Sequence, residues 1–587
     1  MKLKPSHRST TIKLSCGLQS WVILVFCFLS LLPVWAQNYT KDQQKVWIYL
    51  DDTQLSSEDF ILLDFQQRTL NRLSKKSTTT GDNYSDVIPG DRICSQIEQY
   101  VTEIVFYSRS LNAYSAVVTP SNAPNIKNLP FVKELVPVKI YHRQVPTETK
   151  KQLKKSTGSF DFYGNSYDQL QQLNIPAVHD SGYTGAGVRI AIIDAGFYKD
   201  HAAFQHIIDS GRLIAERDFI FRDNNVQDEI SADTTSYPQS RHGTSVWSVI
   251  GGYVPDVLIG AAHGAEFLLA KSERIGSESI LEEDLFVAAV EWADENGADI
   301  ITSSVAYRDF DYGAGDYQFE QLDGKTTNAA KAINWAFERG ILPVICTGNE
   351  RQYFPQDGGL LTPSDAYGAL GVGAVDRNGQ IASFSGHGPT ADGRIKPDLC
   401  ALGVDVYNAT IYTPNSYTYS DGTSFSTPLI AGASALLMEK YPALPPVKII
   451  ELLKSKSNRS NTPSDQYGWG IPNLHRSVFE VDTATFLSWQ PDRQRIYALP
   501  NPAISGVTFA FRWTHVIPSE KQAHLKIYNL RGELVWSTDL DPQISGIDET
   551  TYWNLRNFLG EIVTSGVYIV TVKDQHTTIR GKCLILH

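Results

Sequence analysis

Three short motifs along the chain carry the side chains that nucleophilic catalysis requires. Asp194 comes directly after the apolar run 190–193, His242 begins the motif His-Gly-Thr, and Ser424 lies inside the heptapeptide Gly-Thr-Ser-Phe-Ser-Thr-Pro at 422–428. A serine hydroxyl becomes a nucleophile when an imidazole removes its proton and a carboxylate holds that imidazole in place. Each residue alone is more often structural, an aspartate as a turn or cap and a serine as a helix cap. Together they supply a complete set of groups for acyl transfer.

The segments around the motifs have the patterns needed to position them. Residues 188–193 predict a buried strand that ends at Asp194, and strand ends are where α/β sheets present functional groups. Apolar residues at helical spacing follow His242, so the imidazole is expected at the start of a helix. Ser424 is expected at the amino terminus of a buried helix, where backbone N–H groups and the helix dipole favour an anion.

The sequence between these motifs alternates helix and strand patterns. A helical pattern at 285–292 stops at Gly297 and is followed by a strand pattern from Asp299. A second helical pattern at 329–337 stops at Gly340 and is followed by the apolar run 341–345. This alternation is typical of α/β folds, so residues 160–480 predict a parallel sheet flanked by helices.

The ordered motifs Asp-x-Gly, His-Gly-Thr and Gly-Thr-Ser-x-[Ala/Ser]-x-Pro resemble those of the subtilisin (subtilase, peptidase S8) family of serine proteases. The resemblance covers residues 167–479 and extends to segments at 384–389, 396–398 and 467–470. It implies a subtilisin-like catalytic domain at 160–480 that hydrolyses polypeptides through Asp194, His242 and Ser424. Cys-Thr-Gly-Asn at 346–349 resembles the family's oxyanion segment, which implies that the Asn349 amide donates to the oxyanion beside the Ser424 N–H. The same likeness makes Ser303, Ser304, Val305 and Ala306 the strand that binds substrate and lines its specificity pocket.

Some positions depart from the family's pattern. Ala195 stands where the family usually has serine or threonine, Ala306 replaces a glycine, and Thr347 replaces an alanine. The residue preferred on the acyl side of the cut bond therefore stays open. Two other functions are alternatives: a catalytically impaired subtilase fold that binds partners at a cell surface, and a serine esterase. The absence of a Gly-x-Ser-x-Gly elbow and the order Asp, His, Ser argue against the esterase.

The N-terminal third has the features of an export signal and a propeptide. A basic start, an apolar run at 21–32 and the sequence Val-Trp-Ala before Gln37 predict a signal peptide at 1–36. The alternative is a membrane anchor, but the run is shorter than the ~20 apolar residues that span a bilayer, so no stable span is expected after cleavage. Residues 37–150 resemble the inhibitory propeptides of subtilases through 110–117 and 129–132, which implies a small α+β partner of the protease. A polar linker at 144–159 follows, and a permanent N-terminal domain is the alternative.

The last part of the chain changes to strands and turns without a long helix. Residues 495–587 predict a small β-sandwich. The segments 499–502, 527–532 and 566–570 resemble the C-terminal sorting domain of type IX secretion substrates. That likeness implies outer-membrane secretion machinery as a partner and a location outside the cell or on the outer-membrane surface. An adhesive or stabilising sandwich is the alternative.

Composition limits the remaining possibilities. The 587 residues carry a formal charge of -12, which argues against nucleic acid as a partner. Cysteines lack the Cys-x-x-Cys spacing of zinc sites, so no metal or cofactor is predicted. Calcium sites are common in the resembling family but lie in variable loops, and calcium is left open. Disulfide pairing and oligomeric state are not fixed by this sequence either.

Overall fold

The computed structural model describes residues 43–51, 54–55, 60–62, 68–69, 72, 87–138, 162–228, 238–274, 280–308, 316–481, 497–499, 507–512, 523–529, 531–540, 548–558, 560–573 and 578–585. The predicted signal peptide at 1–36, the predicted linker at 144–159 and residues 500–502 of the sorting motif lie outside them. Among the described residues, no helix combines the length and apolar character needed to cross a membrane.

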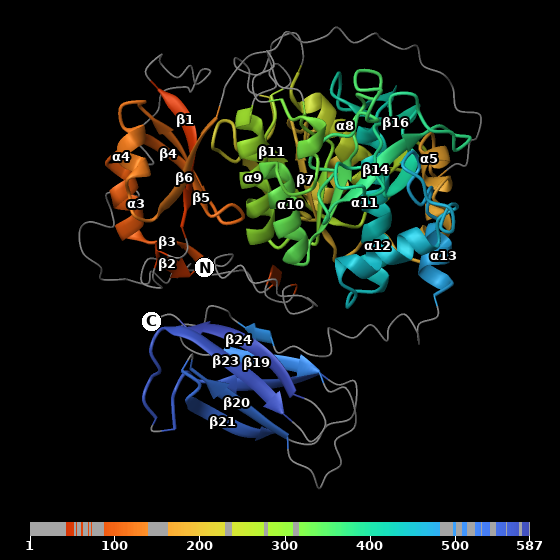
Figure 1. Cartoon of the computed structure of the whole chain (residues 1–587). Coiled ribbons are helices and arrows are strands. Elements are labelled where there is room, and N and C mark those ends of the chain that lie inside the picture. Colours follow the sequence, from red (N-terminus) through yellow and green to blue (C-terminus); the bar gives the residue numbers. More distant parts are fainter. Residues whose placement is uncertain are drawn as a thin grey trace, which may run out of the picture. The chain divides into compact units, whose positions relative to one another are not determined.

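A seven-stranded sheet in the order β15-β14-β13-β12-β7-β11-β8 forms the centre of the middle region (Figure 1). Every neighbouring pair is parallel, which confirms the predicted α/β fold class. The strands are β7 (Arg189–Asp194), β8 (Leu213–Asp218), β11 (Glu266–Lys271), β12 (Ile300–Ser303), β13 (Leu342–Cys346), β14 (Leu370–Val375) and β15 (Leu399–Leu402).

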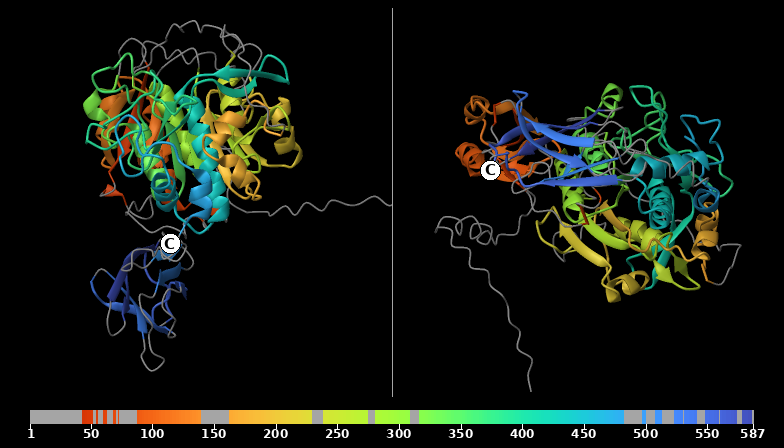
Figure 2. Two further views of the ribbon diagram at one scale, coloured as in Figure 1. Left: turned by 90° about the vertical axis from the view of Figure 1, so that its right-hand side faces the viewer. Right: turned by 90° about the horizontal axis from the view of Figure 1, so that it is seen from below.

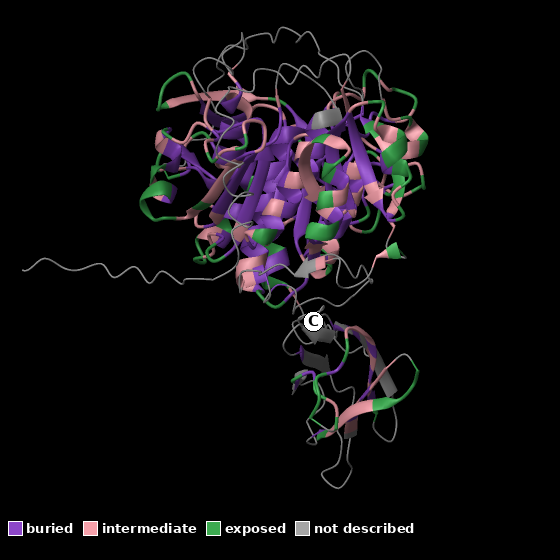
Figure 3. Cartoon of the chain, turned by 90° about the vertical axis from the view of Figure 1, so that its left-hand side faces the viewer, coloured by how far each residue is buried: buried purple, intermediate pink, exposed green. Residues whose placement is uncertain are grey.

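Helices cover both faces of this sheet (Figure 2). Along β7, Ile190 and Ile192 enter the core beneath α8 (Ser240–Gly251) and α11 (Thr423–Lys440). Ala191 and Ile193 enter the other core, beneath α9 (Ile280–Glu295) and α10 (Asn328–Glu338). Because successive side chains of a strand point to opposite faces, a strand buried on both faces is apolar throughout. Figure 3 shows the strands of this sheet as buried.

The remaining elements of the middle region are short. The hairpin of β16 (Val406–Thr410) and β17 (Ser416–Ser420) leads directly into Gly422 and α11. A second hairpin joins β9 (Tyr253–Val254) to β10 (Leu258–Ile259). The other helices are α5 (Tyr167–Gln171), α6 (Ile175–His179), η3 (Ala202–Phe204), α7 (Gln205–Asp209), η5 (Phe319–Gln321), α12 (Pro446–Ser455) and α13 (Leu474–Phe479).

The N-terminal region contains an antiparallel sheet in the order β4-β5-β1-β6. Trp47, Leu111, Ala113 and Val138 of this region share a core with residues of α9 and α10, so it packs on those helices. Its elements are β1 (Gln44–Leu50), β2 (Phe60–Leu62), β3 (Val87–Pro89), α3 (Asp91–Glu98), β4 (Val101–Ser108), β5 (Ala113–Val118), α4 (Ala123–Lys127) and β6 (Val132–Val138).

The C-terminal region has two antiparallel sheets, β18-β19-β22 and β21-β20-β23-β24. Val507 and Trp553 of the first sheet share one apolar core with Leu525, Ile527 and Val570 of the second. The strands are β18 (Tyr497–Leu499), β19 (Val507–Arg512), β20 (Ala523–Tyr528), β21 (Leu534–Leu540), β22 (Asp548–Trp553), β23 (Gly566–Lys573) and β24 (Thr578–Ile585).

Candidate active site

Asp194 and His242 meet at the carboxyl end of the central sheet. Asp194 is the last residue of β7 and is fully buried, and His242 lies in the first turn of α8. The His242 Nδ1 atom lies 2.8 Å from Asp194 Oδ1 and 3.0 Å from Oδ2. Oδ1 also accepts the Ala195 N–H at 2.7 Å, so the carboxylate is held from two sides. A proton on Nδ1 then leaves the basic lone pair of the ring on Nε2, where a general base needs it.

The glycine and threonine after His242 explain how the helix comes so close to the strand. A Cβ atom on Gly243 would lie 2.3 Å from the Gly196 carbonyl oxygen and 3.1 Å from Asp194 Cβ. Only glycine therefore fits at this approach. The Thr244 hydroxyl accepts the Tyr198 N–H at 2.7 Å, which ties the loop after Asp194 to α8.

Ser424 occupies the first turn of α11 and is 7% exposed. Its Oγ lies 3.4 Å from the Ser304 carbonyl oxygen, while the Ser304 hydroxyl donates to the Ser424 carbonyl at 3.0 Å. In a regular helix that carbonyl would accept the N–H of residue 428. Because Pro428 has no N–H, the carbonyl is available to Ser304. The ring of Phe425 lies 6.1 Å from the His242 ring, so the residue after Ser424 packs against the imidazole.

Asn349 follows β13 and points its amide toward the start of α11. Its Oδ1 accepts the Thr423 N–H at 2.9 Å and the Thr423 hydroxyl at 3.1 Å. A backbone N–H can only donate, so the oxygen of the amide must face Thr423. The Nδ2 group is then directed to the other side, where it can donate.

Gly422 marks the space that the two proposed oxyanion donors share. A Cβ atom built on Gly422 would lie 3.6 Å from Asn349 Nδ2 and 3.6 Å from the Ser424 backbone nitrogen. Its φ of +148° also favours glycine. Two N–H donors close together beside a serine hydroxyl are the groups that stabilise a tetrahedral oxyanion.

The strand predicted to bind substrate lies next to this volume. Ser303 ends β12 and is fully buried, with its hydroxyl 3.4 Å from the Ile193 carbonyl oxygen. Ser304 is 8% exposed, and Val305 and Ala306 are half-buried. Ser303 therefore contributes its backbone to this strand, while its side chain serves the packing between β12 and β7.

One buried acid beside the site is absent from the sequence prediction. The Glu273 carboxylate accepts the Tyr307 hydroxyl at 2.6 Å and the Ser272 hydroxyl at 2.8 Å, and the Ser272 N–H donates to the Asp194 carbonyl at 3.0 Å. Burial, with a smaller contribution from the Asp194 charge, raises the pKa of Glu273 to about 7. Glu273 could have been predicted from its position two residues after β11, because Lys271 at the end of that strand pairs in register with Asp194.

The described cysteines and acids do not form a metal centre. Cys94, Cys346, Cys400 and Cys583, the cysteines that the structure describes, form no disulfide, and burial raises the pKa of Cys346 to about 12. Within the described ranges, no group of three or more histidine, cysteine, aspartate or glutamate side chains could hold a metal ion.

The parallel α/β sheet and the groups at its carboxyl edge are those expected of a serine hydrolase. Residues 185–470 match the model of the Subtilase family, and residues 496–586 match that of the Secretion system C-terminal sorting domain. The chain therefore contains a subtilase domain of the serine protease type and a C-terminal sorting domain, as the motifs predicted.

Named relatives agree with this assignment. The chain is 26% identical over 455 residues to Bacillopeptidase F of Bacillus subtilis, a match that covers 70% of this chain and 30% of that protein. It is 27% identical over 386 residues to the Thermostable alkaline protease of Halalkalibacterium halodurans, covering 63% and 93% of the two chains. The match to Subtilisin Savinase of Lederbergia lenta is 27% identical over 310 residues, covering 53% and 97%.

Proposed function

We propose that this chain is a secreted endopeptidase that cleaves polypeptides through Asp194, His242 and Ser424. The observation that supports the proposal is the contact of Asp194 with His242, at 2.8 Å, together with the His242 ring lying 6.1 Å from the ring of Phe425, the residue next to Ser424. The amide nitrogens of Asn349 and Ser424 both lie 3.6 Å from a Cβ atom built on Gly422.

The proposed reaction is acyl transfer in two steps. Ser424 Oγ attacks the carbonyl carbon of the peptide while His242 Nε2 takes the hydroxyl proton, and Asp194 stabilises the imidazolium that forms. The Asn349 amide and the Ser424 N–H donate to the oxyanion. His242 then protonates the leaving amine. A water molecule, deprotonated by His242, hydrolyses the acyl-enzyme and regenerates the Ser424 hydroxyl.

We propose in addition that residues 37–150 are a propeptide that is cut off in the segment before residue 167. Its support is an interface built of buried charge pairs. Asp284 of α9 accepts the Trp47 indole N–H at 2.6 Å and lies 2.9 Å from Lys45 Nζ, with both charged side chains fully buried. Glu291 of α9 accepts the N–H groups of Arg109 and Ser110 at 3.0 and 2.9 Å. Such pairs fix one docked geometry, which suits a folding template and inhibitor.

Secretion through the outer membrane is proposed from the sorting domain. The match at residues 496–586 supports recognition of that domain by the type IX machinery. Whether the protease is then released or stays on the surface follows from processing of this domain.

Expression of the wild type and of Ser424→Ala tests the proposal. N-terminal sequencing and casein hydrolysis are measured on both chains. The wild type is expected to cut itself between residues 144 and 167 and to digest casein, while Ser424→Ala does neither. A fluorophosphonate probe should label Ser424 in the wild type only. Equal behaviour of the two chains would instead support a surface-binding protein without catalysis.

A further inference from the structure

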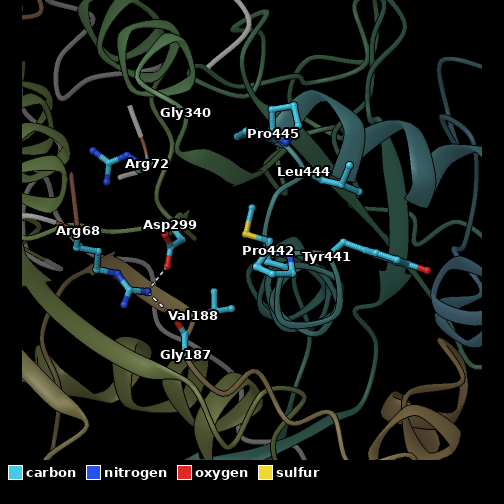
Figure 4. A pocket seen from close by; sticks show the side chains of 12 residues that line it. Arg68, Arg72, Gly187, Val188, Asp299, Gly340, Tyr441, Pro442, Leu444 and Pro445 are labelled. Atoms are coloured by element: carbon cyan, nitrogen blue, oxygen red, sulfur yellow. Dashed lines mark hydrogen bonds and ion pairs between the residues drawn. The ribbon is translucent and has the colours of Figure 1, made fainter. Parts of the chain in front are cut away.

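Two arginines of the N-terminal region reach the edge of the central sheet that lies opposite the triad. Arg68 Nη2 donates to the Gly187 carbonyl at 2.6 Å and pairs with Asp299 (Figure 4). Gly187 lies two residues before β7, and Asp299 immediately precedes β12. The strands are parallel, so their amino ends share one edge, while Asp194 and Ser303 lie at the carboxyl edge.

Arg72 binds the same edge at a more buried position. It is 4% exposed, donates to the carbonyl oxygens of Ala298 and Arg339, and pairs with the fully buried Asp294. Between the two arginines, the Thr69 hydroxyl donates to the Asp294 carbonyl at 2.9 Å. The contacts thus continue from Arg68 to Arg72, one helical turn apart in the sequence.

The acceptors at this edge are suited to guanidinium groups. The carbonyls of Asp294, Gly297 and Ala298 lie at the end of α9, and that of Arg339 follows α10. Carbonyls at helix carboxyl ends lack partners in the helix and carry partial negative charge. Arg68 Nε donates to Gly297 at 3.1 Å as well, so its planar fork binds a carboxylate and carbonyls together.

Asp294 requires cations here, since it is buried. Arg72, Arg109 and Arg339 all lie against it, and together they hold the pKa of its carboxyl well below the usual range although burial acts in the opposite sense. Two of these three guanidiniums belong to the N-terminal region. If the N-terminal region dissociated, Arg339 would be the one arginine of these three that stays beside Asp294.

A cavity of about 230 Å³ adjoins the arginines. Its walls include Val188, Met438 and Leu444, so apolar surface lies next to the charged groups. A peptide bound at this edge would place guanidiniums on the carboxylates and its hydrocarbon stems along this wall.

We propose that this edge is a second binding site for the propeptide, specific for two arginines four residues apart, and that it delays release of the propeptide after cleavage. The inference rests on the proposed propeptide function. A propeptide that binds through two contacts acts as a bivalent ligand. When one contact breaks, the other holds the propeptide in place, so the broken contact can re-form before the propeptide dissociates. In the mature protease, the same edge recaptures a free propeptide through Arg68 and Arg72.

The test uses the full chain with Arg68→Ala and Arg72→Ala together. The matched control is Lys127→Ala, which removes an exposed cation from α4 of the same region. In the active chain, size-exclusion chromatography measures how much cut propeptide stays bound to the protease. The lag before hydrolysis of a short peptide begins measures how slowly the propeptide is released. We expect release at least about tenfold faster than in wild type and in the control, because the loss of the buried Arg72–Asp294 pair and the half-buried Arg68–Asp299 pair acts mainly on dissociation. Activity after complete release should be unchanged.

Hydrogen exchange on the uncut Ser424→Ala chain gives a second readout that needs no catalysis. The double arginine variant should lose protection at residues 297–299 and 339–342, while β1 stays protected. Release within twofold of wild type, or unchanged exchange at this edge, would overturn the proposal. If the wild type is never cut, the propeptide function fails, and exchange alone decides whether the edge binds the arginines. The chain with Arg68→Lys and Arg72→Lys should release its propeptide at an intermediate rate, since lysine keeps the charge but lacks the planar fork.

Discussion

Replacing Asn349 separates its proposed role in catalysis from its role in holding the start of α11. Its Oδ1 accepts two hydrogen bonds from Thr423, at 2.9 and 3.1 Å, which leaves Nδ2, 3.6 Å from a Cβ atom built on Gly422, as the group of this amide that can donate. Asn349→Ala removes both functions. Asn349→Asp keeps an oxygen toward Thr423 and replaces the donor by a carboxylate oxygen.

The magnitudes follow from these two sets of contacts. Loss of one oxyanion donor lowers kcat on the order of 10²- to 10³-fold, which corresponds to about 2.7–4 kcal/mol of transition-state stabilisation. Thr423 is fully buried, so leaving its N–H without an acceptor costs about 1–3 kcal/mol of folding free energy. Asn349→Ala should therefore lose both activity and thermal stability. Asn349→Asp should lose at least as much kcat and keep more of the stability.

The assay is kcat and KM on a chromogenic peptide, per mole of chain that has lost residues 37–150 on a gel. This normalisation is needed because a slow variant also matures slowly. Thermal unfolding of the same two substitutions in the Ser424→Ala chain gives the stability change without self-digestion. Retained activity in Asn349→Asp would refute the assignment of Nδ2 as an oxyanion donor. The assignment would also fail if, across the two variants, the loss of kcat followed the loss of thermal stability.

Three further predictions concern packing and pH. Gly243→Ala should abolish most casein hydrolysis, since its Cβ would lie 2.3 Å from the Gly196 carbonyl oxygen and displace His242; normal kinetics would contradict this. Burial opposes ionisation of Asp398, but Lys396 and Lys454 lower the pKa of its carboxyl to about 2. The ionised carboxylate then contributes about 2 kcal/mol to the free energy of unfolding above pH 3.8, and this contribution is lost as the pH falls through 2. The melting temperature of Asp398→Asn at pH 7 should therefore be lower than that of the unsubstituted chain. Burial lowers the pKa of His263 to about 3, so the unfolded chain binds a proton at this residue before the folded chain does. The free energy of unfolding is therefore unaffected by His263 above pH 6.5 and falls as the pH drops toward 3. The melting temperature of His263→Gln should change less between pH 7 and pH 4 than that of the unsubstituted chain.

Much of the candidate site is readable from the sequence because each motif is local. The run before Asp194 is apolar in every position, which a strand buried on both faces requires, and it became β7. The small residues after Ser424 predict a helix that packs closely on other elements, and α11 is buried along most of its length. Gly243 and Gly422 lie where a side chain would collide or would enter the shared donor space, so their positions in the motifs have a steric cause.

Other features depend on contacts between distant segments and have no local pattern. The strand order places β12 and β13 on one side of β7 and β11 on the other, and this follows from packing across the sheet. Ser303 belongs to the predicted substrate strand, yet the pleat turns its side chain inward. Arg68 and Arg72 were not singled out, because two cations in a sequence give no sign of the carbonyls that they meet at the ends of α9 and α10.

The two edges of the sheet have different chemistry for one geometric reason. At the carboxyl ends of β7, β12 and β13 the chain leaves the strands into loops and helix starts, which supply Asp194, Ser304 and Asn349. The amino ends of β12 and β13 receive the chain from the ends of α9 and α10, which expose carbonyl oxygens and attract cations. A substrate bound at the carboxyl edge cannot displace arginines from the other edge, which lies about one strand length away, ~13–20 Å for four to six residues. Substrate therefore does not compete for the acceptors of Arg68 and Arg72, and the proposed delay in propeptide release depends on the amino edge alone.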